Sequence, residues 1–511
     1  MIPAAKAAPR GWTAARTLAL GLALPLAAGA ACVLGFAPFY AWPVPIAALA
    51  ILFATWTRSL TARQAALSGY AFGLGFFLTG VSWVYVSLHY YGSMPLVLAA
   101  LATFLFCAIL ALYPALAGWI AVRIGKRSEP ARLLAAPAAF VLCEWLRGWV
   151  FTGFPWLTTG TSQVPGSALA GFAPLVGAYG TSLAVAGAAA LVAALFRTYA
   201  GSRARIMLVI ALAALFAAGG LARLAEWTEP AGPPVSVALL QGNVPQDLKW
   251  RDDVRTRTLL DYRQMIFDAP AKIVVLPETA LPAFLDQLPA DYLESLREHA
   301  RTTGKEVLMG TVERVYRGQE FDYYNSVVRL TGGAVQSYRK RHLVPFGEFI
   351  PPGFKWVLAI LKIPMSDFAS GAQKQPPLEA GGTSFAVAVC YEDLFGEEMI
   401  DMLPAAQVLL NVSNVAWFGA SLAPEQQMQA SQMRALETGR WMVRATNTGA
   451  TAAIDARGRV VSRLPGFTHG TLVANAVPRK GETPYVRLGN APSILLAFAM
   501  LLLAWRRASL R

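Results

Sequence analysis

A carboxylate, an amine and a thiol each follow a short run of apolar or β-branched residues in the second half of the sequence. Glu278 ends the string Ile-Val-Val-Leu-Pro-Glu, Lys340 lies in Tyr-Arg-Lys-Arg-His, and Cys390 ends Phe-Ala-Val-Ala-Val-Cys. A cysteine at its free pKa is mostly protonated, so a neighbouring base must take its proton before the sulfur attacks. A nearby cation favours the thiolate and can stabilise the oxyanion of a tetrahedral intermediate. The three residues together predict nucleophilic catalysis through Cys390.

Each of these residues also has a purely structural interpretation. Glu278 could cap the turn after its strand, and Lys340 could be a solvated cation in a basic run. Cys390 could be a buried packing residue. His342, two residues after Lys340, could be an ordinary surface histidine or the base of a Cys-His pair. The residues taken one at a time leave these alternatives open.

The other cysteines differ from Cys390 in their surroundings. Cys32, Cys107 and Cys143 lie in long apolar runs, where a free cysteine is usually an inert packing residue. Cys390 is the only cysteine between residues 225 and 491, so it has no disulfide partner in that segment. If this segment is exported, as the loop charges described below predict, a thiol without a disulfide partner is a candidate for a reactive group.

Alternating short strands and helices are predicted to position these three side chains. Strand and helix alternation predicts an α/β layered domain, in which functional groups lie where a strand ends and a loop begins. Apolar and β-branched runs predict strands at residues 235–240, 273–276, 307–312, 326–330, 385–390, 408–412, 442–446, 451–454 and 472–476. Helical patterns occupy residues 254–267, 290–302 and 425–437.

The rest of the chain is too apolar for a water-soluble domain. Hydrophobic residues make up 55% of the 511 residues and charged residues only 14%, whereas soluble domains have about a quarter charged residues. Runs long enough for a membrane span need about 20 apolar residues. Eight spans are predicted, near residues 18–34, 43–56, 70–88, 95–122, 133–150, 172–196, 206–221 and 494–505.

Charge alternates between successive loops of this apolar part. Basic residues precede the first predicted span and follow the second, fourth and sixth, whereas loops 87–94 and 151–170 contain no Lys or Arg. Cytoplasmic loops of membrane proteins are enriched in basic residues. We therefore expect a cytoplasmic N-terminus, a membrane domain over residues 1–224, an extracytoplasmic domain over 225–491, and an eighth span with a cytoplasmic tail over 492–511. The net charge of +14 belongs to the membrane part, so it does not indicate a surface that binds nucleic acid.

The order Glu, Lys, Cys at strand ends resembles the nitrilase superfamily, and longer strings resemble its membrane-bound branch, the apolipoprotein N-acyltransferases. The string KRHLVPFGEF at 340–349 is the most specific of them. The others are LQGNVPQ at 240–246, LPETA at 276–280, YNS at 324–326, CYE at 390–392, AWFG at 416–419 and MRALE at 433–437. This resemblance implies a nitrilase-like αββα sandwich joined to an eight-span α-helical membrane domain.

The resemblance also implies roles for individual residues. It makes Cys390 the nucleophile, Glu278 the general base and Lys340 the group that stabilises the tetrahedral intermediate. It implies supporting active-site roles for Glu348, Tyr391, Glu392 and Trp250. One departure is visible, because the family usually has an aspartate where this chain has Val415. The departure leaves the role of that carboxylate in doubt and touches none of the three triad positions.

By the same resemblance, the chain is expected to transfer an acyl chain from a phospholipid to a lipoprotein. The donor would be the sn-1 chain of phosphatidylethanolamine, and the acceptor the α-amine of an N-terminal diacylglyceryl-cysteine. We expect a monomer in the bacterial cytoplasmic membrane, in contact with membrane lipids, with its catalytic domain on the periplasmic face. No cofactor is expected, and the four scattered histidines lack metal-ligand spacing. One rival interpretation is a membrane-tethered amidase or nitrilase that acts on a small polar substrate. The other is a transporter or receptor with a degenerate nitrilase module that binds a partner.

Overall fold

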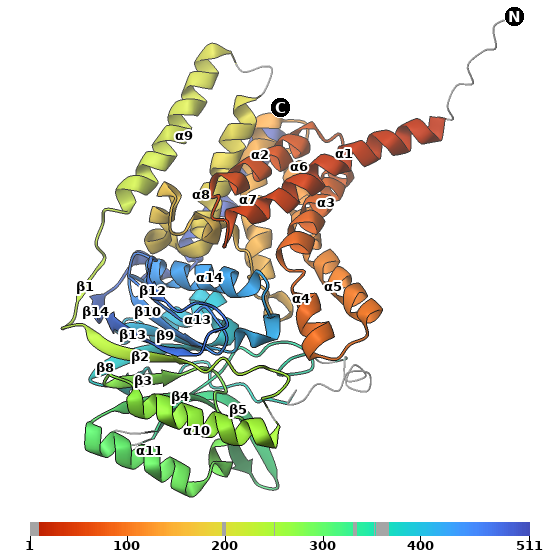
Figure 1. The fold of residues 1–511 in the computed structure, drawn as a ribbon. Helices are drawn as coiled ribbons and strands as arrows, with labels where there is room; N and C mark the ends of the chain where they lie inside the picture. Colours follow the sequence, from red (N-terminus) through yellow and green to blue (C-terminus); the bar gives the residue numbers. More distant parts are fainter. Residues whose placement is uncertain are drawn as a thin grey trace, which may run out of the picture.

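The chain folds into a bundle of helices packed on a domain of two β-sheets (Figure 1). The computed structural model describes residues 10–196, 201–249, 251–330, 335–351, 353 and 367–510. The bundle contains the first nine helices together with the last one, so the sheet domain is inserted between two bundle helices. Chain order therefore predicts that both ends of the sheet domain lie close to the bundle.

Each predicted membrane span lies largely in one or two helices of this bundle. The helices are α1 (Arg10–Cys32), α2 (Pro43–Arg58), α3 (Ala62–Gly80), α4 (Val84–Val86), α5 (Leu96–Leu110), α6 (Leu112–Gly125), α7 (Glu129–Arg147), α8 (Ala173–Leu195), α9 (Ser202–Ala222) and α16 (Ala491–Ser509). Their outward faces carry large exposed apolar side chains such as Leu101, Ile210 and Leu496, as expected for helices that contact lipid.

The predicted number of eight spans is not confirmed. Among the described residues, four helical segments are long and apolar enough to cross a membrane: Leu96–Gly125, Ala168–Leu195, Ser202–Ala222 and Ala491–Ser509. A fifth is possible if Ala62–Gly80 and Val84–Tyr91, which are bent by 54° at their junction, form one broken span. The apolar stretches Gly21–Gly35 and Pro43–Arg58 are shorter than a span, and α7 carries four charged residues.

Two of the α7 charges, Glu144 and Arg147, are buried, and the sequence assigned no role to either of them. Their hydrogen bonds go to the following loop. Glu144 accepts bonds of 2.7 Å from both the backbone N–H and the hydroxyl of Thr159. The guanidinium of Arg147 donates to the carbonyl oxygens of Phe154 and Trp156. The two buried charges thus hold the loop that faces the sheet domain.

Two six-stranded sheets form the second part of the described chain. The order of the first is β13 (Gly470–Ala476), β2 (Val235–Gln241), β3 (Ile273–Leu276), β4 (Glu306–Arg317), β5 (Glu320–Arg329) and β6 (Gln336–Arg339). The order of the second is β12 (Val460–Arg463), β11 (Ala452–Ile454), β10 (Trp441–Thr446), β9 (Val408–Ser413), β8 (Thr383–Val389) and β7 (Leu378–Ala380). A short pair, β1 (Thr228–Pro230) and β14 (Arg479–Gly481), joins both ends of the domain.

The sheets pack through their apolar faces and are covered by helices outside. Val237 and Val275 of the first sheet share a core cluster with Phe385 and Val387 of the second. The opposite face of the first sheet packs in a separate cluster beneath α10 (Asp252–Asp268) and α11 (Ala290–Thr303), visible in Figure 1. Helix α14 (Ala423–Thr438) lies between the second sheet and the bundle (Figure 1). The layers follow the predicted αββα order.

Helix α14 binds the bundle through buried amide groups, which attach the two parts of the chain to each other. Gln426 accepts hydrogen bonds from the indoles of Trp83 and Trp156 and donates to the carbonyl of Gly80. Gln429 accepts from the backbone of Ala37 at 2.8 Å. At the far end of the helix, Glu437 accepts from the N–H of Ala178, beside the kink at Gly177 in α8.

Candidate active site

Cys390 follows β8 directly, on a sharp turn that aims its side chain out of the strand. Its φ is +57°, a left-handed conformation that is uncommon for any residue other than glycine. The backbone is held there because its carbonyl accepts two hydrogen bonds of 2.9 Å, from the side-chain amides of Asn411 and Gln427. Only 8% of Cys390 is exposed. The turn thus fixes a buried thiol at the end of a central strand.

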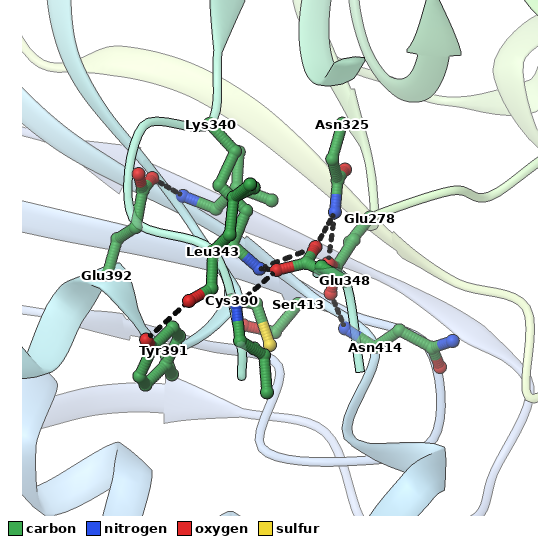
Figure 2. A network of polar contacts seen from close by, with 12 residues as sticks. Glu278, Asn325, Lys340, Leu343, Glu348, Cys390, Tyr391, Glu392, Ser413 and Asn414 are labelled. Atoms are coloured by element: carbon green, nitrogen blue, oxygen red, sulfur yellow. Dashed lines mark hydrogen bonds and ion pairs between the residues drawn. The ribbon is translucent and has the colours of Figure 1, made fainter. Parts of the chain in front are cut away.

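Glu278 and Lys340 come from the other sheet and lie in the same cluster as Cys390 (Figure 2). Glu278 follows β3, and its carboxylate accepts bonds of 2.7 Å from the amide of Asn325 and from the backbone N–H of Asn414. Lys340 follows β6, and its side chain is fully buried. Its Nζ lies 3.8 Å from Oε1 of Glu278. Three strand ends on two sheets therefore converge on one buried site.

Glu348 provides a second carboxylate beside Lys340. The Nζ of Lys340 lies 2.7 Å from its Oε2 and 2.9 Å from its Oε1. The same carboxylate accepts from the amide of Asn325 at 2.8 Å and from the N–H of Val344 at 2.8 Å. Each of these contacts is made by an N–H donor, as suits a carboxylate that only accepts hydrogen bonds. The ammonium of Lys340 thus faces two carboxylates, with Glu348 the nearer.

Glu392 ties the turn of Cys390 to the loop that follows Lys340. Its carboxylate accepts bonds from the N–H groups of Val389 at 2.7 Å, Arg341 at 2.8 Å and His342 at 3.0 Å, and from the hydroxyl of Tyr338 at 3.2 Å. Burial raises the pKa of Glu392 to about 7, although the N–H donors and Lys340 act in the opposite direction. Glu392 thus fixes the turn at Cys390 relative to the loop that follows Lys340.

Of the remaining expected residues, Tyr391 lies beside Lys340. Tyr391 donates from its hydroxyl to the carbonyl of Leu343 at 3.0 Å, and Lys340 lies 5.6 Å from the centre of its ring. Trp250 lies outside the described residues. The imidazole of His342 lies 2.7 Å from Glu398, so its contacts do not support the Cys-His alternative.

Electrostatics of the cluster favour a protonated thiol and a charged lysine at rest. Burial and the charge of Glu278 raise the pKa of Cys390 well above its ordinary value, against the opposing effect of Lys340. Burial alone would lower the pKa of Lys340, but Glu348, Cys390 and Glu278 outweigh it and raise the pKa. The thiol therefore needs a base at the moment of attack, and the carboxylate of Glu278 is in the cluster to serve.

Two residues of the site, Asn325 and Asn414, were not predicted from the sequence. Both hold Glu278, through an amide and a backbone N–H respectively. The YNS string contained Asn325, but an asparagine in a strand carries no sign of its partners. Val415, which replaces the usual aspartate, is only 1% exposed. The contact from its neighbour Asn414 to Glu278 is made without an acid at that position.

Two family models match this chain. The N-terminal domain of apolipoprotein N-acyltransferase matches residues 28–191, and the carbon-nitrogen hydrolase model matches residues 236–483. The apolipoprotein N-acyltransferase of Nitrosomonas europaea is 48% identical over 93% of this chain and 94% of its own length. That of Chromobacterium violaceum is 46% identical over 98% and 96%. Among solved structures, a mutant amidase of Nesterenkonia AN1 has 18% identity over 52% of this chain and 97% of its own, with a TM-score of 0.36, too weak to bear on function.

Proposed function

The chain belongs to the apolipoprotein N-acyltransferase family, and from that premise we propose how its own residues carry out N-acylation of lipoproteins. Cys390 takes an acyl chain from a membrane phospholipid, the sn-1 chain of phosphatidylethanolamine, as a thioester. It then passes the chain to the α-amine of the diacylglyceryl-cysteine at the N-terminus of a lipoprotein. The observation that carries this proposal is the meeting of Glu278, Lys340 and Cys390 at three strand ends.

In the first step, the sulfur of Cys390 attacks the ester carbonyl carbon while Glu278 accepts the thiol proton. The carbonyl oxygen becomes an oxyanion, and the ammonium of Lys340 stabilises its charge. Collapse of this intermediate breaks the bond to the glycerol oxygen, which takes the proton back from Glu278. A lysophospholipid leaves, and the acyl chain remains on the sulfur as a thioester.

In the second step, the α-amine of the acceptor attacks the thioester carbonyl. Glu278 takes a proton from the amine, Lys340 again stabilises the oxyanion, and the carbon–sulfur bond breaks. The departing thiolate recovers the proton from Glu278, so the enzyme returns to its starting state and an amide has formed. Burial of Cys390, of which 8% is exposed, supports transfer to the amine over hydrolysis because it limits access of water.

Roles for the supporting residues belong to the same proposal. Glu348 holds the ammonium of Lys340, and Glu392 holds the backbone on both sides of the site. Tyr391 keeps the loop of Leu343 beside the nucleophile. Trp250, next in sequence to the buried Lys249, is proposed to contribute to substrate handling through the family resemblance alone.

The location of the enzyme is proposed from its helices and their charges. A bacterial cytoplasmic membrane would hold the membrane domain, residues 1–224, and the final segment, residues 492–511, with basic loops in the cytoplasm. The catalytic domain, residues 225–491, would then face the periplasm. Helices α9 and α16, which flank this domain in the chain, are both apolar enough to span. Both substrates are lipids of that membrane, and one monomer contains the complete triad.

Replacement of Cys390 tests the proposal. Purified wild type, Cys390→Ala and Cys390→Ser are incubated with phospholipid and a diacylglyceryl lipopeptide, and the triacylated product is measured by mass spectrometry. Both variants should fold and insert but make no product, while Cys107→Ala, a buried cysteine of α5, should retain activity. With phospholipid alone, wild type should carry a hydroxylamine-sensitive acyl group on Cys390. Full activity of Cys390→Ala would refute the proposal, and a missing adduct would refute its thioester step.

A further inference from the structure

Asn325 connects the two carboxylates of the site through a single amide group. It lies in β5 opposite Val312 of β4, and only 4% of it is exposed. Its Nδ2 donates to Oε1 of Glu278 at 2.7 Å and to Oε1 of Glu348 at 2.8 Å, as Figure 2 shows. An asparagine amide has two N–H bonds. Both are therefore used, one for each carboxylate.

The backbone of Asn325 makes the third contact to the catalytic cluster. Its carbonyl accepts a hydrogen bond of 2.7 Å from the N–H of Lys340. One strand residue thus contacts the general base, the lysine and the second glutamate. Its neighbour Ser326 points elsewhere and donates to Glu313. The three contacts are specific to position 325 of the strand.

We propose that Asn325 is a positioning residue that keeps Glu278 ionised and correctly oriented for proton transfer. The inference rests on the proposed function, because it takes Glu278 as the base. Two carboxylates that share a site repel each other, and the usual result is that one of them becomes protonated. A carboxylate that has already gained a proton cannot accept another from a thiol. Donors that bind the ionised oxygens stabilise the charged carboxylate and so oppose its protonation.

Other charged groups act on Glu278 from several directions and must be considered in any pH experiment. Lys340 lies 3.8 Å away at the end of β6, and Glu348 shares the amide from the neighbouring loop. Cys390 interacts electrostatically with Glu278 from the end of β8, and the buried Lys249 does so from the loop after β2. Asn325 is neutral, so its effect on Glu278 comes from its donors and can be separated from these charges by substitution.

The test is the pH dependence of acyl-enzyme formation in Asn325→Asp and Asn325→Ala. The aspartate keeps the shape of the side chain, removes both donors and adds a third negative charge. The alanine removes the donors without adding charge. Acylation of Cys390 from phosphatidylethanolamine in detergent micelles is followed in single turnovers by mass spectrometry. Asn475→Asp, the same change at an exposed position of β13, is the matched control.

We expect the acid limb of the rate profile of Asn325→Asp to move to higher pH by about one to three pH units, the size of the effect that one neighbouring charge has on a carboxylate. Asn325→Ala should show a smaller shift in the same direction. In both variants the rate should recover as the pH is raised, which loss of structure alone would not produce. Asn475→Asp should follow wild type.

Two results would overturn the inference. One is a wild-type rate and profile in both folded variants, and the other is a uniformly lower rate with an unshifted profile. If Asn325→Asp does not fold, Asn325→Ala alone decides between these outcomes. Failure of the proposed function is distinct, since wild type would then form no adduct on Cys390 at any pH.

Discussion

Replacement of Glu348 by glutamine is the most informative single change at the site, because it removes one charge and preserves the volume. The carboxylate accepts from Lys340, Asn325 and Val344, with every contact made by a donor. A glutamine side chain has one oxygen and one NH₂ group. Whichever way the amide is turned, the NH₂ must face at least one of these donors.

The cost of this change follows from the contacts. A buried donor left without an acceptor costs about 1–3 kcal/mol, and a hydrogen bond to a charged group contributes about 1.5–3 kcal/mol. Lys340 would in addition lose its nearest counter-charge, at 2.7 Å. If about 3–5 kcal/mol of this cost falls on the transition state, the rate drops by about 10²- to 10⁴-fold, because each tenfold change requires 1.36 kcal/mol.

The assay compares kcat/KM of wild type and Glu348→Gln for transfer from phosphatidylethanolamine to a diacylglyceryl lipopeptide. Thermal unfolding of both proteins in the same detergent separates lost activity from lost structure. Glu320→Gln, the same substitution at an exposed residue of β5, should behave as wild type. A folded Glu348→Gln protein with activity within about twofold of wild type would show that Lys340 does not depend on this carboxylate.

Two further predictions concern stability. Because the pKa of Glu392 is raised from 4.5 to about 7 in the folded chain, the folded state binds the proton more tightly. The contribution of Glu392 to the free energy of unfolding should therefore fall as the pH rises from about 4.5 to 7. Glu392→Gln should lose this pH dependence of the melting temperature. Melting temperatures that change with pH equally in wild type and variant would contradict the prediction. Gly177→Ala, at φ +67° with Tyr485 ring atoms 2.3 Å from the added methyl, should destabilise by about 2–5 kcal/mol. Gly187→Ala in the same helix has open space and should not; equal melting temperatures would contradict this prediction.

The sheet domain could be predicted from local patterns because its strands are continuous apolar runs. The runs ending at Leu276 and Val389 are fully buried strands, and the polar residue that follows each lies at the site. The order of the strands and the pairing of the two sheets carry no such local signal. The family resemblance supplied the αββα arrangement of layers, and the strand order came only from the structure.

The supporting contacts of the site were beyond prediction because they join residues far apart in the sequence. Asn325 and Asn414 reach Glu278 across separations of 47 and 136 residues. The sequence around a strand asparagine does not indicate whether its side chain binds a carboxylate or water. Only the fold determines which carboxylate it faces.

The number of spans was the weakest prediction, for a physical reason. Hydropathy cannot tell a helix that meets lipid from one that is buried among other helices. Helix α7 is apolar along much of its length, yet Glu144 and Arg147 are buried within the protein and bind a loop. A charged helix of this kind fails a composition test without being exposed to water.

The contacts of helix α14 determine whether the sheet domain can be produced as a separate fragment. The amides of this helix have their acceptors and donors in the bundle, among them Gly80, Ala37 and Val164. A fragment limited to the sheets would expose this row of amides and its buried apolar neighbours to water at the same time, and we expect it to aggregate. The same hydrogen bonds oppose movement of the sheets against the bundle, so we expect Cys390 to keep its position while the lipid substrates move to it.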